Sequence, residues 1–190
     1  MSRENVVRGA RYRISLPRER AGGCRTLDER FFVRFPALYR VLANALMRML
    51  PRPRLRRRLF ARVVRRGYAA ANRRDWEILV MGLDPGIEFH PRQDLLAPGQ
   101  AAVFYGHAGY RELWRIWLEA FEDLQLEPEE VLDLGDTFLV MTRLKAHGSG
   151  SGVPIDQPFV QLFKLQRGLV VWQRDFRDRS EALEAAGLSE

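Results

Sequence analysis

The chain has 190 residues, of which 46% are hydrophobic and 29% charged, and these values exclude a collagen-like or fully disordered chain. No apolar run approaches the roughly 18 residues of a membrane-spanning helix, and the charged N-terminus lacks the apolar stretch of a secretory signal. We therefore expect a cytoplasmic protein with one domain and an extension. The single cysteine, Cys24, excludes an intramolecular disulfide.

The charge is divided unevenly along the chain. Residues 1–75 contain 21 arginines and five acidic residues, a balance of +16, whereas residues 76–190 have ten basic and 19 acidic residues, a balance of −9. Such asymmetry indicates either a basic arm for an acidic partner or an arm that docks on its own acidic domain. Because only two of the 31 basic residues are lysines, part of the arginine content can reflect codon usage.

The N-terminal half predicts a leader followed by three helices. Residues 1–26 lack apolar periodicity, so we expect a mobile leader, with order beginning near Leu27. Apolar residues at three- and four-residue steps predict amphipathic helices over residues 35–50 and from about residue 55 to residue 71. A short third helix is expected over residues 76–83.

The C-terminal half predicts a sheet covered by one long helix. Residues 109–124 carry a wide apolar stripe that predicts a helix, and four strands are expected over residues 130–134, 137–146, 155–165 and 169–176. Their short, turn-rich connections favour antiparallel pairing. A three-residue connection at residues 166–168 would place Phe159 opposite Asp175 and Gln161 opposite Gln173. A capping box at Asp178 starts a last helix.

Three stretches carry a resemblance to a known family. They are VVRRGYAAANRRDWEILVMGLDPGIEFHP, GHAGYRELWRIWLEAFEDLQLEPEEVLDLGDTFLV and GSGSGVPIDQPFVQLFKLQRGLVVWQRDFRDRSEALEAAGL. Together they resemble the SnoaL-like polyketide cyclase branch of the nuclear transport factor 2-like superfamily. The resemblance implies a cone-shaped α+β fold, with a curved antiparallel sheet covered by helices around a pocket and dimerisation through the outer sheet face. We expect a basic N-terminal extension over residues 1–57 and the SnoaL-like domain over residues 58–190.

The resemblance also places a carboxylate in the pocket. Hydrolase-like relatives have an Arg-Asp-Tyr-Phe-Asp signature on the last strand, and residues 174–178, RDFRD, stand in its place, so Asp175 falls on the carboxylate position. The relatives pair it with an Arg-x-Asp element, whose nearest counterpart is RLK at residues 143–145; Arg143 is therefore the second catalytic candidate. The second carboxylate is missing, and Gln161 replaces the relatives' pocket histidine. These departures reduce the acid–base capacity.

A carboxylate among aromatic residues could act as a general base near neutral pH, while an ion pair with a nearby arginine is the structural alternative for Asp175. The other candidate ligand-binding residues are aromatic, histidine or glutamine side chains expected on the sheet and the long helix. They are Tyr110, Trp114, His90, His107, Phe159, Gln161, Phe163 and Gln173. Tyr68 and Tyr105 could each offer a hydroxyl, whereas Trp117 is expected in the core. The histidines have no third ligand at a recognisable spacing, so we expect no metal site and no cofactor.

Two functions remain open from the sequence. The first is a small-molecule-binding protein that can act as an enzyme, of cyclase, isomerase or hydrolase type, on a hydrophobic, oxygenated substrate. The second is a noncatalytic binding or dimerisation module with a basic partner-binding arm. For the arm we rank docking within the molecule or across a homodimer first, a membrane surface second and nucleic acid last, because its arginines match no standard nucleic-acid reader.

Overall fold

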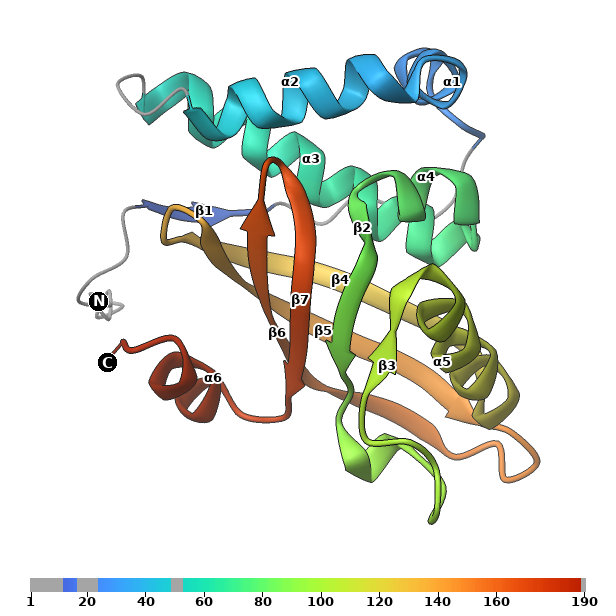
Figure 1. Cartoon of the computed structure of the whole chain (residues 1–190). Coiled ribbons are helices and arrows are strands. Elements are labelled where there is room, and N and C mark those ends of the chain that lie inside the picture. The colour runs from blue at the N-terminus through green and yellow to red at the C-terminus, as the bar shows by residue number, and fades with distance from the viewer. Residues whose placement is uncertain (1–11, 17–23, 49–52, 189–190) are drawn as a thin grey trace.

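The computed structural model describes residues 12–16, 24–48 and 53–188, and the strands in these ranges form one curved, unclosed sheet (Figure 1). The strand order is β1-β4-β5-β6-β7-β2-β3. The bounds of the strands are β1 Tyr12–Ser15, β2 Leu83–His90, β3 Phe104–Tyr105, β4 Phe121–Asp133, β5 Thr137–Gly148, β6 Pro154–Gln166 and β7 Leu169–Phe176. The expected α+β fold is confirmed. The sheet is mixed rather than wholly antiparallel, because β2 pairs with β7 in parallel.

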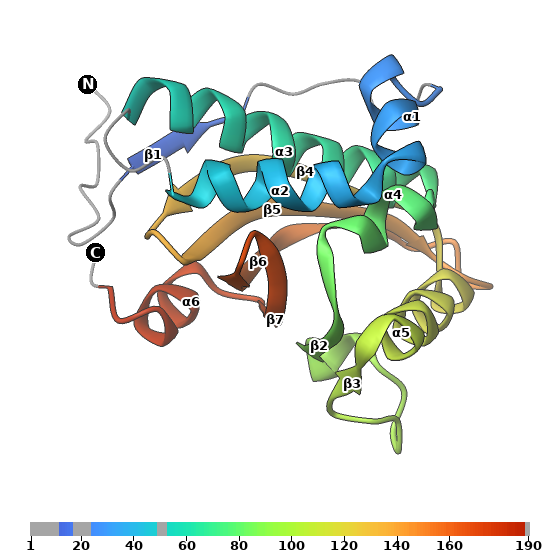
Figure 2. The same cartoon turned by 45° about the horizontal axis from the view of Figure 1, so that its top comes forward.

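Helices cover the inner face of the sheet and its open end (Figures 1 and 2). Their bounds are α1 Leu27–Arg34, α2 Pro36–Arg48, α3 Pro53–Arg73, α4 Trp76–Met81, α5 Gly106–Ala120 and α6 Arg179–Ala185, with a 3₁₀ turn at Gln93–Leu95. The main core lies between the inner sheet face and helices α3 and α5. A smaller cluster forms on the outer face beneath α6.

Helix α3 is tied to the sheet by a buried ion pair. Arg56 binds both carboxylate oxygens of Asp133, at 2.7 and 2.8 Å, and the Gly135 carbonyl at 3.0 Å. Both side chains are almost completely buried. The expected domain boundary at residue 57 falls inside α3, which runs without a break from the arginine-rich segment into the tyrosine and alanine residues of the core.

Part of the expected leader is ordered. Tyr12–Ser15 forms strand β1, which pairs with the end of β4, and Ile14 is buried. The prediction that order begins near Leu27 is therefore wrong, although most of the leader, residues 1–11 and 17–23, lies outside the described residues. Helix α1 was also not predicted. A capping box starts it, in which the Thr26 hydroxyl accepts from the Glu29 backbone and the Glu29 carboxylate accepts from the Thr26 backbone.

Two predicted boundaries need correction. Helix α5 ends at Ala120 rather than residue 124, because β4 begins at once with Phe121. The β6–β7 connection is a two-residue turn in which Arg167 and Gly168 both have positive φ, at 51° and 83°, as a type I′ turn requires. A bulge follows it, so Gln161 faces Asp175 and the predicted pairing was shifted by two residues. A shift by two keeps the same residues on the inner face.

Candidate functional site

A cavity of about 170 Å³ lies between the inner face of the sheet and helices α2 to α5. Its walls are mainly apolar. Helix α2 supplies Tyr39, Ala43 and Leu46, α3 supplies Phe60, Val64 and Tyr68, α5 supplies Tyr110, Trp114 and Trp117, and the sheet supplies Phe89, Phe138, Gln161, Phe163 and Gln173. The cavity thus depends on the N-terminal helix α2 as well as on the sheet.

A chain of hydrogen bonds forms the polar wall of the cavity. The Thr142 hydroxyl donates to the Tyr68 hydroxyl at 3.2 Å, which donates to Gln161 Oε1 at 2.5 Å. The Gln161 amide then donates to Asp175 Oδ1 at 2.9 Å, and the Gln173 amide donates to the same oxygen at 3.1 Å. The carboxylate thereby fixes the orientation of both glutamine side chains.

Burial sets the protonation of this network. Desolvation raises the pKa of Asp175 to about 7, although the hydrogen bonds from Gln161 and Gln173 act in the opposite direction. Burial also raises the pKa of Tyr68 and of Tyr110 above the usual value for a phenol. Both tyrosines are therefore neutral at physiological pH and act as hydrogen-bond donors or acceptors, while Asp175 is the group that changes charge near neutrality.

Three buried polar atoms of this region have no hydrogen-bond partner among the described residues: Gln173 Oε1, Trp117 Nε1 and Asp175 Oδ2. Gln173 and Trp117 line the cavity, whereas Asp175 is not among the residues that line it. Because buried polar groups are nearly always paired in folded proteins, these atoms are exceptions, and two of the three belong to residues that line the cavity.

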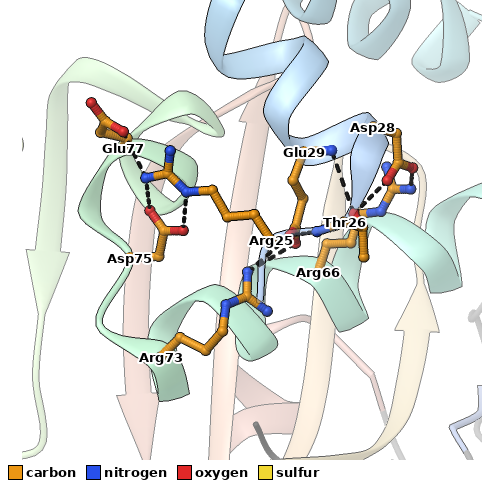
Figure 3. A network of polar contacts seen from close by, with 8 residues as sticks. All are labelled: Arg25, Thr26, Asp28, Glu29, Arg66, Arg73, Asp75 and Glu77. Atoms are coloured by element: carbon orange, nitrogen blue, oxygen red, sulfur yellow. Dashed lines mark hydrogen bonds and ion pairs between the residues drawn. The ribbon is translucent and has the colours of Figure 1, made fainter. Parts of the chain in front are cut away.

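The end of the cavity next to α1 is charged, since Glu29 and Arg66 also line it. Figure 3 shows how α1 is fastened there. Glu29 accepts two hydrogen bonds from Arg73, both at 3.0 Å, and Asp28 pairs with Arg66. Both acidic residues of α1 are therefore engaged by arginines of α3.

Five of the predicted ligand-binding residues line one cavity: Tyr110, Trp114, Gln161, Phe163 and Gln173. Phe159 does not line it; its side chain is fully buried, with its ring centroid 6.0 Å from that of Trp117. His107 contacts the Leu83 carbonyl at 3.2 Å, and His90 pairs with Glu88 and lies against Trp172. Both histidines are outside the cavity lining.

The structure does not bring Arg143 to Asp175. Strand residues alternate between faces, and Thr142 points inward beside Tyr68, so Arg143 points outward, where it pairs with Asp156. The predicted pairing of Asp175 with Arg143 is therefore wrong, and the side chains that contact Asp175 are those of Gln161 and Gln173. A one-residue displacement in the aligned motif is enough to move a side chain to the opposite face.

Sequence reasoning missed the contribution of helix α2 and gave Trp117 only a core role. Trp117 is buried but also lines the cavity with its indole nitrogen unpaired. Tyr68 and Tyr105 were both predicted only as residues that could offer a hydroxyl to a ligand. Tyr68 is central to the polar wall, whereas Tyr105 is exposed. The sequence did contain a signal for Tyr68. It lies on the apolar stripe of α3 but carries a polar hydroxyl, which needs a hydrogen-bond partner when it is buried.

Within the ranges that the structure describes, no cluster of three or more histidine, cysteine or acidic side chains is arranged to hold a metal ion. In the same ranges no helix combines the length and the apolar character needed to cross a membrane.

Solved structures with the same fold confirm the architecture. The protein TerC, crystallised with polyporic acid, shares 23% identity over 62% of this chain and 89% of its own, with a TM-score of 0.56. An NTF2-like protein of unknown function from Burkholderia pseudomallei shares 22% sequence identity over 65% of this chain and 93% of its own, also with a TM-score of 0.56. A protein with a ketosteroid isomerase-like fold from Catenulispora acidiphila, in complex with trimethylamine, shares 15% sequence identity over 67% of this chain and 93% of its own. Its TM-score is 0.53.

No curated protein matches the sequence. The family model for the SnoaL-like domain matches residues 64–173, which is more than half of the chain. This segment supplies strands β2 to β6, most of β7, helix α5 and both Gln161 and Gln173, whereas Asp175 lies two residues beyond it. The expected resemblance is therefore confirmed, and the chain belongs to the SnoaL-like domain family.

Proposed function

We propose that the protein binds a small, mainly apolar molecule that carries a hydroxyl or another hydrogen-bond donor. The observation that carries this proposal is the buried, unpaired Oε1 of Gln173, a residue that lines a mainly apolar cavity. The carboxylate of Asp175 holds the amide end of Gln173, so the oxygen end is left to accept. Trp117 Nε1 offers a donor to an oxygen of the same molecule.

The size of the cavity limits the ligand. A cavity of roughly 150 Å³ in another protein accommodates benzene, and the cavity here is about 170 Å³. A single aromatic ring with one or two polar substituents therefore fits the structure as it stands. Related structures contain polyporic acid and trimethylamine, which supports the use of this fold for small organic molecules.

Acid–base catalysis is the second candidate function, and one observation favours it. The pKa of Asp175 is raised to about 7, which suits a group that takes or gives a proton near neutral pH. Such an activity would be of cyclase, isomerase or hydrolase type. Binding is the better supported function, because Asp175 does not line the cavity and the expected partner Arg143 is on the other face of the sheet.

The test compares phenol with toluene, which have similar shape but differ in the hydroxyl. Isothermal titration calorimetry should show phenol binding about tenfold more tightly, because its hydroxyl satisfies Gln173 Oε1. Gln173→Leu should remove this preference, whereas Gln166→Leu on the exposed end of β6 should preserve it. Equal affinities in the unmodified protein, or a preference that survives Gln173→Leu, would contradict the proposal.

A second measurement addresses the natural ligand. Native mass spectrometry of the purified protein, followed by denaturation, should release a small molecule if one is retained in the cavity. Its mass would then be compared with the single-ring size limit. A retained molecule whose amount is unchanged by Gln173→Leu would place the binding site elsewhere.

A further inference from the structure

Exposed apolar side chains are concentrated on the N-terminal helices. Ten large hydrophobic side chains are exposed in the described part of the chain, and eight of them belong to α1, α2, α3 or the residue between α1 and α2. Six of the eight fall within residues 27–42, which we call the α1–α2 surface: Leu27, Phe31, Phe35, Leu38, Val41 and Leu42. A patch of this kind on an otherwise polar exterior indicates an interaction site.

Helix α2 is apolar on two opposite sides. Tyr39, Ala43 and Leu46 line the cavity, whereas Val41 points away from it and is 63% exposed. The inward side is explained by packing on the domain, which agrees with docking of the arm within the molecule. The outward side has no such explanation, because none of the described helices or strands covers it (Figure 2).

The same surface is basic. Arg30, Arg34 and Arg40 are exposed within the same segment, and the guanidinium of Arg34 lies 5.9 Å from the centroid of the Phe35 ring. Residues 24–48 contain only two acidic residues, Asp28 and Glu29, and both are bound to arginines of α3. The α1–α2 surface therefore presents apolar and positively charged groups with no unengaged carboxylate between them.

We propose that the α1–α2 surface docks on an anionic lipid bilayer. Phenylalanine, leucine and valine side chains would enter the boundary between headgroups and acyl chains, while the arginines would contact the lipid phosphates and carboxylates. A bilayer offers negative charge and apolar material side by side, which matches both features of the surface. A second copy of the chain fits less well, because a two-fold contact would bring arginines against arginines.

Contacts between α1 and the domain hold this surface in place. Arg25 binds Asp75 through two hydrogen bonds and Glu77 through a third, all at 2.6 Å, and Glu29 binds Arg73 (Figure 3). The surface is therefore presented by folded helices rather than formed at the membrane. Helix α2 would then lie between the bilayer and the cavity, so a hydrophobic ligand could exchange with the lipid; this last step rests on the proposed function.

Vesicle sedimentation with the full chain tests the docking. The probes are vesicles of phosphatidylcholine alone and vesicles of phosphatidylcholine mixed with phosphatidylserine. We expect binding to the mixed vesicles, weak binding to phosphatidylcholine, and loss of binding as salt is raised. The assay contains no ligand, so its outcome is independent of phenol binding.

Two pairs of matched variants locate the contact. Val41→Glu should abolish vesicle binding, while Val153→Glu, at a valine that is 58% exposed outside this surface, should leave it unchanged. Arg40→Glu changes the charge by two units and should weaken vesicle binding about 25-fold, because each unit of positive charge contributes roughly fivefold. Arg111→Glu, at an exposed position on α5, makes the same charge change outside this surface and should have a smaller effect.

Three results would overturn the proposal. The first is no binding to mixed vesicles. The second is equal loss of binding in both members of a matched pair, which would show a general charge effect or contact elsewhere. The third is lipid-free self-association in sedimentation velocity that Val41→Glu abolishes, which would assign the surface to a second copy of the chain. Unchanged circular dichroism of Val41→Glu would show that its effect does not come from unfolding.

Discussion

Replacing Asp175 by asparagine should change how the stability of the protein depends on pH. The carboxyl is buried, and burial raises its pKa from 3.8 to about 7. Between these two values the folded state keeps a proton on Asp175 that the unfolded state has lost. Because the folded state binds more protons, the contribution of Asp175 to the free energy of unfolding falls as the pH rises through this window and levels off on either side of it.

The shift sets the magnitude of the effect. Each pKa unit corresponds to about 1.4 kcal/mol, so a shift of about three units makes the folded state about 4 kcal/mol less stable at pH 8 than at pH 4 through this group alone. Asparagine has nearly the same shape and no charge in this range. The stability of the natural protein relative to Asp175→Asn should therefore decline by about 4 kcal/mol over the same interval.

Urea unfolding of both proteins at a series of pH values measures this difference. Taking the difference between the two proteins cancels the titration of every other group. Glu122→Gln, at an exposed position on β4, serves as the control for replacing a carboxyl by an amide outside the core. A flat profile for Asp175→Asn, or stability that rises with pH relative to the variant, would refute the assignment of a buried, largely protonated carboxyl.

Three further predictions concern the elements that build the cavity. An added Cβ at Gly168 would lie 2.6 Å from backbone atoms of α2, whereas at Gly150 it meets nothing within 4 Å, and both residues have positive φ. Gly168→Ala should therefore lower the melting temperature more than Gly150→Ala; equal losses would mean that α2 does not pack on this turn. Arg56→Met should cost about 3–5 kcal/mol in urea unfolding, because it leaves the buried Asp133 charge unpaired, and a loss below about 1 kcal/mol would argue against the pair. Trp117→Ala should cost about 3–5 kcal/mol as a large buried side chain, and unchanged thermal unfolding would show that its face of α5 is assigned incorrectly.

The periodicity of apolar residues and the positions of turn residues in the sequence determined most of the helices and strands of the domain. The apolar stripe of residues 109–124 predicted α5, although the helix begins at Gly106 and ends at Ala120, and the family resemblance predicted the fold. The inward direction of Gln161, Gln173 and Asp175 followed from the two-residue period of strands, which survives a register error of two residues. These features depend on local pattern, and local pattern is what a single sequence records.

Side-chain partners and the position of α2 were decided only by the tertiary structure. The pairing of Tyr68 with Gln161 joins residues 93 positions apart, and no local periodicity specifies such a contact. The bulge that sets the β6–β7 register and the outward direction of Arg143 depend on the placement of a single residue. Helix α2 is apolar on two sides, so its pattern alone does not reveal which side closes the cavity. The cavity wall fixes that choice, because Tyr39, Ala43 and Leu46 must face the sheet for the core to close.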